Sequence, residues 1–266
     1  MSELKNKVIW LTGASSGIGE ALAYELADKG AKLILSARRK EELERVKGNC
    51  KQAVRDDIRI LPLDLAQPQS LEAATKTAIQ FHGHVDVLIN NGGISQRSLA
   101  LESSMDVYRR LMEVNFFGAV ALTKYILPHF VSRKQGHIAT LSSVAGKYGT
   151  PYRSGYAASK HALHGFFDSV RAEHFKDNVT ITMLCPGVIN TPITMSALTG
   201  DGTPMNKMDE WQSKGKPVKW CAEKIVHAIE NKKEEAYIGG KEVFLIYIRR
   251  FLPFLYYRII RNVKVR

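Results

Sequence analysis

Thr12-Gly13-Ala14-Ser15-Ser16-Gly17-Ile18-Gly19 is the stretch of sequence that decides the fold. It follows the apolar, β-branched run 7–12 and precedes a segment, 17–29, whose apolar residues recur at helical spacing. Glycines between a strand and a helix allow a tight turn, and they let a phosphate approach the free N–H groups at the helix N-terminus. The spacing is G-x-x-x-G-x-G rather than the commoner G-x-G-x-x-G, but the strand-turn-helix context is the one a dinucleotide needs. We therefore interpret Gly13, Ser15, Ser16, Gly17, Ile18 and Gly19 as a pyrophosphate-binding loop.

Working outward from this loop, short apolar runs alternate with helical patterns along the chain. The pattern predicts strands at 7–12, 32–36, 58–62, 85–89, 136–141, 179–184 and 236–239, and helices at 17–29, 40–53, 68–81, 105–130, 154–175 and 220–231. Such alternation indicates right-handed βαβ units. We expect an α/β fold: a single-domain, doubly wound (Rossmann-type) parallel sheet of about seven strands with helices on both faces. This domain should span 1–240, followed by an extension over 241–266.

The end of the second strand bears on the choice of nucleotide. It reads Ser36-Ala37-Arg38-Arg39-Lys40, with no carboxylate to accept a hydrogen bond from a ribose 2′-hydroxyl. Arg38, with Arg39 as the weaker candidate, can instead bind a 2′-phosphate through a guanidinium. The sequence therefore predicts NADP(H) as the cofactor.

Tyr156 and Lys160 lie four residues apart on a predicted helix and so share a face. An adjacent ammonium favours the phenolate, and the pair could exchange a proton with an alcohol or ketone near neutral pH. Two hydroxyls, Ser142 and Ser143, follow the fifth strand at the edge of the sheet where ligands gather. A serine there can stabilise charge that develops on a substrate oxygen.

Two further segments complete the pattern. Asn90-Asn91-Gly92-Gly93 ends the fourth strand in a turn suited to contacting a cofactor, and Asn115 stands inside the following predicted helix, where Asn has poor propensity.

Together these residues resemble the classical short-chain dehydrogenases/reductases, from about residue 5 to 240. The resemblance implies that Tyr156 is the acid/base, that Lys160 is its partner and a nicotinamide-ribose ligand, and that Ser143, rather than Ser142, orients the carbonyl. It implies that Asn115 holds a water in a proton relay. It also implies cofactor contacts from Asp64, Leu65, Asn91, Gly92, Pro186, Gly187, Ile189 and Thr191.

The sequence departs from the family pattern in two places. Gly92 stands where Ala is typical, which we expect to loosen the turn slightly. Ser16 stands where many NADP-preferring members have a basic residue, so Arg38 would carry the 2′-phosphate, helped by Ser15 or Ser16.

The cysteines, histidines and charged residues bear on the compartment, on metal binding and on the partners of the protein. The three cysteines fit neither a zinc site nor a disulfide framework, which predicts a reducing compartment, the cytoplasm. The pairs His82/His84 and His161/His164 have no further ligand at a sensible spacing, so no metal is expected. The net charge is +12, and half of this excess falls in 241–266.

The segments 191–219 and 241–266 bear on the substrate and on partners. The first is long and irregular, as active-site lids are. Its apolar side chains suggest an apolar ligand, although they could equally pack against the core: Met195, Leu198, Met205, Met208 and Trp211. The second interleaves aromatic and aliphatic residues with Arg and Lys, which suits a helix in the interface of an anionic membrane. The alternatives are packing against a neighbouring subunit or over the substrate entrance. Nucleic acid is not expected as a partner, because no binding module is present.

Two functional classes follow. The first is an NADP(H)-dependent oxidoreductase that transfers a hydride between nicotinamide and a ketone or secondary alcohol, most simply by reducing an apolar carbonyl compound, and we expect a homodimer or homotetramer. The second is a catalytically idle cofactor-binding or membrane-adaptor protein on the same fold. The intact Ser143, Tyr156 and Lys160 favour the first.

Overall fold

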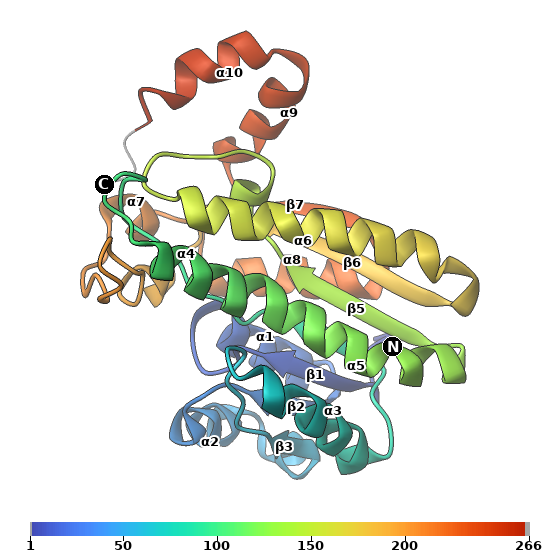
Figure 1. The fold of residues 1–266 in the computed structure, drawn as a ribbon. Helices are drawn as coiled ribbons and strands as arrows, with labels where there is room; N and C mark the ends of the chain where they lie inside the picture. Colours follow the sequence, from blue (N-terminus) through green and yellow to red (C-terminus); the bar gives the residue numbers. More distant parts are fainter. Residues whose placement is uncertain (1, 264–266) are drawn as a thin grey trace.

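A computed structural model describes residues 2–263 and shows one seven-stranded parallel sheet of order β3-β2-β1-β4-β5-β6-β7 (Figure 1). The strand order reverses between β1 and β4, where doubly wound sheets bind their ligands. The strands are β1 (Val8–Thr12), β2 (Lys32–Ser36), β3 (Ile58–Ile60), β4 (Val87–Asn90), β5 (Gly136–Leu141), β6 (Val179–Pro186) and β7 (Glu235–Ile238). The predicted α/β fold is confirmed.

Helices cover both faces of this sheet. One face is covered by α1 (Gly17–Asp28), α2 (Lys40–Asn49) and α8 (Val218–Glu230). The other is covered by α3 (Pro68–His82), α5 (Gly118–Arg133) and α6 (Ser154–Glu173), with α4 (Met105–Met112) packed against α6. Side chains of a strand alternate between the two faces, so Ile9 and Leu11 join the first core while Val8 and Trp10 join the second. Both faces of the strands are therefore buried, as in other all-parallel sheets.

Local sequence explains where the observed elements depart from the predicted ones. The helix predicted over 40–53 ends at Asn49, after the poor helix former Gly48, and a 3-10 helix follows over Gln52–Asp57. The third strand ends at Ile60, although the Leu61 and Leu63 N–H groups still donate to β2 and its extension. Pro62, which stands between them, has no N–H to donate.

The helix predicted over 105–130 is one continuous helical stretch, Met105–Arg133, with a π-helical segment at Glu113–Phe117. Among the described residues it is the one helix long and apolar enough to cross a membrane by length and composition. It packs along α3, α6 and β5, as a core helix does.

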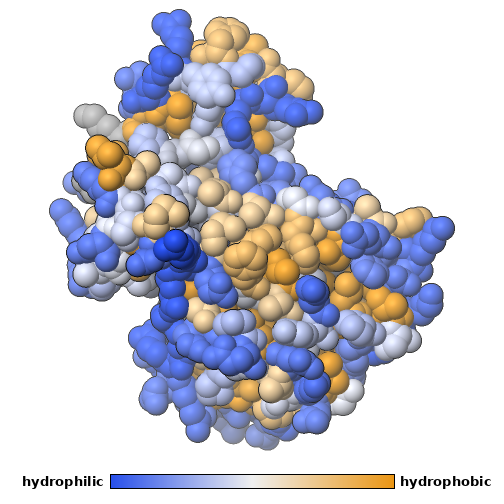
Figure 2. Space-filling view, viewed as in Figure 1, coloured by the Kyte–Doolittle hydropathy of each residue, from blue (hydrophilic) through white to orange (hydrophobic). Residues whose placement is uncertain are grey.

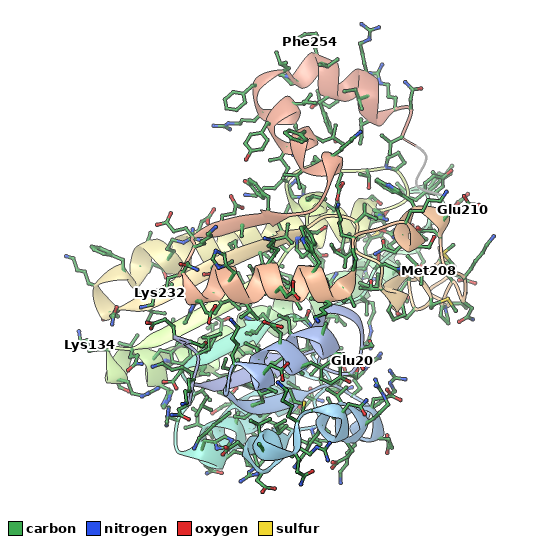
Figure 3. The ribbon with its side chains drawn as sticks, turned by 180° about the vertical axis from the view of Figure 1, so that it is seen from behind. Glu20, Lys134, Met208, Glu210, Lys232 and Phe254 are labelled. Carbon is green, nitrogen blue, oxygen red and sulfur yellow. The ribbon has the colours of Figure 1, made fainter. Side chains whose placement is uncertain are left out.

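The predicted lid, residues 191–219, and residues 241–263 of the C-terminal extension lie at the end of the molecule where the strands finish. The lid holds a 3-10 turn at Pro192–Thr194 and the short α7 (Glu210–Ser213). Figure 3 labels Met208 and Glu210 there, and Phe254 at the outer end of the extension. The extension forms α9 (Phe244–Phe251) and α10 (Pro253–Ile260), which project from the layered body in Figure 1. The predicted extension runs to residue 266, and its last three residues, 264–266, lie outside the described part of the chain.

Candidate active site

A cavity of about 600 Å³ opens at the carboxyl ends of β1, β4, β5 and β6. With the exception of Asn115, every residue predicted from sequence for the site lines this cavity: Gly13, Ser15, Ser16, Gly17, Ile18, Gly19, Arg38, Arg39, Asp64, Leu65, Asn91, Gly92, Ser143, Tyr156, Lys160, Pro186, Gly187, Ile189 and Thr191. The topology thus brings seven separate segments of the chain to one cavity.

Two glycines of the loop after β1, Gly13 and Gly19, have no room for a side chain. Gly13 has a φ of 65°, and a Cβ there would lie 2.7 Å from the Gly92 Cα. A Cβ on Gly19, in the first turn of α1, would overlap the Gly13 carbonyl oxygen. Asn91 fastens the loop from the side, because its Nδ2 donates to the carbonyls of Thr12 at 2.9 Å and Gly13 at 3.1 Å. The loop is therefore a bare backbone cradle at a helix N-terminus, which fits a dinucleotide pyrophosphate.

The rim beside this loop is basic. Arg38 and Arg39 are exposed at the end of β2, and within residues 2–263 neither guanidinium has a hydrogen-bond or ion-pair partner. By contrast, the nearby Arg45 is held by Glu20 through an ion pair of 2.7 Å. The Asp64 Oδ1 accepts a hydrogen bond from the Ala66 N–H at 3.0 Å, within the turn that Asp64 itself belongs to. The free cations of this rim are therefore Arg38 and Arg39.

Lys160 is buried, and its Nζ donates to the Leu141 carbonyl at 2.7 Å. The other two N–H groups of the ammonium are left for the cavity that Lys160 lines. The Nζ lies 5.9 Å from the centre of the Tyr156 ring, so the helical spacing does put the two groups side by side. Burial lowers the pKa of Lys160 to about 8, because desolvation disfavours the charged form.

Asn115 is buried behind the cavity wall, in the π-helical segment. Its Oδ1 accepts from the Ile94 N–H at 2.8 Å, and its Nδ2 donates to the Ile94 carbonyl at 3.0 Å and to the Ser159 Oγ at 2.9 Å. Asn115 thus joins the loop after β4 to the helix that carries Tyr156 and Lys160. The poor helix propensity of Asn was the sequence signal, and the local change to π geometry is its structural counterpart.

The two serines after β5 have different surroundings. The Ser142 hydroxyl donates to the Lys160 carbonyl at 3.1 Å, which ties β5 to α6. The Ser143 hydroxyl donates to the Pro186 carbonyl at 3.2 Å and accepts from the Ala145 N–H at 3.1 Å.

Gly92 does not leave the turn loose, contrary to the expectation from sequence. A Cβ at this position would lie 2.6 Å from the Leu65 Cδ1, so the Leu65 side chain already occupies the space that an alanine methyl would need.

Sequence reasoning missed several residues of the site. Arg97, Arg110, Arg153 and Gln212 also line the cavity. The Arg97 guanidinium forms a buried ion pair of 2.8 Å with Asp209, which joins the loop after β4 to the lid. Gln212 donates to the Ile189 carbonyl from α7. Arg97 and Arg153 lie outside regular elements, Arg110 lies in α4 and Gln212 lies in the short α7, so no common periodicity marks them. Of the five apolar lid residues named from sequence, Met195 lines the cavity.

His164 does have neighbours of ligand type, although sequence spacing suggested none. Its ring nitrogen, the Cys185 thiol and a Glu235 carboxylate oxygen lie within 4.8 Å of one another. The Lys147 ammonium is already 2.5 Å from that carboxylate, and burial raises the pKa of the Cys185 thiol well above its usual range. A neutral thiol beside a neutralised carboxylate is a poor ligand set, and the absence of a metal stays a prediction.

Comparison with known proteins agrees with this geometry. The sequence matches the short chain dehydrogenase family over residues 7–201. It is 43% identical over 256 residues to human dehydrogenase/reductase SDR family member 7, covering 94% of this chain and 76% of that protein. It is 40% identical over 263 residues to mouse dehydrogenase/reductase SDR family member 7B, covering 97% and 81%.

Solved structures share the fold. An alcohol dehydrogenase from Thermococcus sibiricus, complexed with 5-hydroxy-NADP, is 26% identical with a TM-score of 0.76 and covers 90% of this chain and 98% of that one. A short chain dehydrogenase/reductase from Burkholderia phymatum, in complex with NAD, is 23% identical with a TM-score of 0.83 and covers 96% of each chain. The protein belongs to the short-chain dehydrogenase/reductase family of oxidoreductases, whose fold binds a nicotinamide cofactor.

Proposed function

We propose that this protein is an NADP(H)-dependent oxidoreductase that reduces an apolar ketone to the secondary alcohol, or runs the reverse reaction. The observation that carries the proposal is the shared cavity, in which Tyr156, Lys160 and Ser143 stand on one wall and the glycine cradle on another. The bound nicotinamide supplies the hydride. The protein residues bind, orient and move the proton.

Each catalytic role follows from a position in this cavity. Tyr156 gives a proton to the substrate oxygen during reduction, and the neighbouring Lys160 ammonium stabilises the phenolate that results. Ser143 offers its hydroxyl to the same oxygen. Asn115 anchors Ile94 and Ser159 beside Lys160 and would hold the water that returns the proton from solvent. Ile189 and Thr191 would contact the carboxamide, and Asp64 and Leu65 the adenine.

The test of this mechanism is Tyr156→Phe, with NADPH affinity followed by fluorescence titration. Loss of the proton donor should lower kcat by roughly 100-fold or more while the Kd for NADPH changes little. If turnover persists at the level of the unmodified protein, the mechanism is wrong. If no ketone is reduced by the unmodified protein while NADPH binds tightly, the idle cofactor-binding alternative holds.

The preference for NADP(H) rests on the two unpartnered arginines at the end of β2. Arg38→Ala should weaken NADPH binding by roughly 10-fold or more, the loss of a charge-assisted hydrogen bond, and leave NADH binding nearly unchanged. Arg39→Ala is the matched control and should have the smaller effect. Equal affinity of the unmodified protein for NADPH and NADH would refute the preference.

For the extension we propose a peripheral contact with an anionic membrane. Its inner side packs on the loop after β5: the Tyr256 hydroxyl donates to the Gly149 carbonyl at 2.6 Å, and Ile246 and Tyr256 join a small core with Tyr148. Its outer side keeps large apolar side chains exposed: Phe244, Tyr247, Phe251, Leu252, Phe254 and Tyr257. Exposed arginines stand among them: Arg250, Arg258 and Arg261. Arg249 lies on the inner side, where it donates to the Lys147 carbonyl. Figure 2 shows orange and blue residues mixed over this lobe. Aromatic side chains flanked by cations suit an anionic lipid interface.

Removing the whole extension would be a poor test, because the Glu242 carboxylate accepts from the Val188 N–H at 2.9 Å in the turn that lines the cofactor side of the cavity. The better test compares the full chain with the double variant Phe251→Ser/Phe254→Ser. The control is Phe175→Ser, which alters an equally exposed phenylalanine outside the extension, 69% exposed against 73% and 66%. The full chain should co-sediment with vesicles of 30% phosphatidylserine at low salt, and the double variant should lose most of this binding. Equal sedimentation of the double variant and the full chain would refute the membrane contact.

We also propose a homodimer or homotetramer in the cytoplasm. Figure 2 shows an apolar band over α5 and α6. In the helical stretch that ends with α5, Phe117 and Tyr125 are exposed. The three cysteines are free and buried, as suits a reducing compartment. Light scattering on the purified protein tests the assembly, and a monomer at micromolar concentration would refute it.

A further inference from the structure

Arg153 lies close in the chain to the predicted catalytic tyrosine. It stands three residues before Tyr156, at the residue that precedes α6, and its own carbonyl accepts the Ala157 N–H at 2.8 Å. The preceding residue, Tyr152, has a φ of 64°, a left-handed conformation that is costly for a bulky residue. The Ser98 N–H donates to the Tyr152 carbonyl at 3.1 Å and holds this turn.

The Arg153 guanidinium lies in the cavity without a polar partner. Its Nε and Nη2 are inaccessible to solvent and make no hydrogen bond within the described residues. Its Cζ lies 5.8 Å from the ring centre of Trp211, a residue of the lid. Burial, and then the neighbouring Arg97, lower the pKa of Arg153 to about 10, which still leaves it charged at neutral pH. Arg153 is half-buried, and a charged guanidinium whose Nε and Nη2 are shielded from solvent and unpaired is costly to maintain.

No neighbouring carboxylate is free to neutralise this charge. The one acidic group beside it, Asp209, uses Oδ2 to accept from both Nε and Nη2 of Arg97, at 2.9 and 2.8 Å. Its Oδ1 accepts from the Gln212 N–H at 2.6 Å. The Arg97–Asp209 pair is thus complete, and Arg153 adds a positive charge that nothing in the described chain balances.

The cofactor is a poor candidate for the missing partner. The phosphate cradle follows β1 and the free Arg38 follows β2, whereas Arg153 packs on Trp211 from the lid, on the substrate side. The group that meets Arg153 should therefore belong to the molecule that the lid covers.

We propose that Arg153 binds a carboxylate carried by the substrate, so that the substrate class is a keto acid, or the corresponding hydroxy acid, with an apolar body. This inference rests on the proposed function and refines its substrate. The carboxylate accepts from the end of the guanidinium that faces the cavity, because Nε and Nη2 are shielded from solvent. The apolar body packs against Ile193 and Met195, which line the same cavity.

The experiment uses matched pairs of ketones. NADPH oxidation is followed with aryl keto acids that have one to four methylene groups between ketone and carboxylate, and with the methyl ester of each. The full chain should prefer at least one acid over its ester by about 10- to 100-fold in kcat/KM, the value of a charged hydrogen bond. Arg153→Gln should abolish this preference through KM, and Arg153→Lys should restore part of it.

Two controls separate recognition from other causes. Arg110→Gln removes an exposed cation from the rim of the same cavity and should keep the preference. Arg153→Gln should keep its NADPH affinity and should unfold at an equal or higher urea concentration, because an unpaired buried charge has been removed. A lower unfolding midpoint together with an unchanged acid preference would mean a structural role and would overturn the proposal.

The remaining outcomes tell the two proposals apart. If the full chain reduces the esters as well as the acids throughout the series, the Arg153 inference is overturned and the reductase stands. If no ketone is reduced, the reductase fails, and calorimetry with the saturated carboxylic acids on the NADPH-loaded protein decides the inference. Binding that Arg153→Gln removes would support it, and no binding would overturn it.

Discussion

Replacing Asp209 by Asn tests how the lid is held. The Arg97 and Asp209 side chains are only 1% and 2% exposed, and the two residues are separated by 112 positions in the chain. The Asn side chain has nearly the same shape, so the main change is that the buried Arg97 guanidinium loses its counter-charge beside the equally cationic Arg153. Breaking one partner of a buried pair costs about 3–5 kcal/mol. We expect a loss of this size in the free energy of unfolding.

Urea unfolding followed by circular dichroism measures this loss, with the slope of the transition checked for a two-state change. The matched control is Asp106→Asn, which breaks an ion pair with Arg109 whose side chains are 89% and 71% exposed. An exposed pair of this kind contributes little to stability. If Asp209→Asn lowers the unfolding free energy no more than Asp106→Asn does, the ion pair does not hold the lid.

Three further predictions follow from single residues. Gly19→Ala should abolish NADPH binding in a fluorescence titration, because its methyl would overlap the Gly13 carbonyl oxygen, and retained affinity would refute the cradle. Burial lowers the pKa of His137 to about 4, so the unfolded state takes up a proton between pH 6.5 and 4 that the folded state does not. His137 should therefore account for a fall in stability of roughly 3 kcal/mol as the pH drops through this window. His164, whose pKa burial also lowers to about 4, adds a fall of its own. A flat urea midpoint, or the same fall in a His137→Phe variant, would contradict the assignment. Burial lowers the pKa of Lys160 to about 8, so the kcat for ketone reduction should decline as the pH rises through about 8, where the ammonium is lost. A kcat that is constant up to pH 9.5 would speak against that role.

The sequence pointed most directly to those parts of the candidate site whose residues are fixed by the local backbone, in a turn or along one helix. The glycine loop is recognisable in the sequence because the turn between a strand and a helix itself needs Gly13 and Gly19. Tyr156 and Lys160 could be predicted to be neighbours because a helix brings residues four positions apart onto one face. The expectation for Gly92 failed because the Leu65 side chain, from another segment, fills the space beside it.

The sequence by itself determined the alternation of strands and helices along the chain, the glycine loop after the first strand and the spacing of the tyrosine-lysine pair, since periodicity and turn chemistry act over a few residues. Only the tertiary structure decided that Arg97 is neutralised by Asp209 and that Arg153 is not, because charge balance depends on residues from distant segments. It also decided which side of the basic extension faces the protein and which side keeps its phenylalanines exposed. The cavity, for which the lid sequence suggested an apolar ligand, thereby gains the positive charge of Arg153.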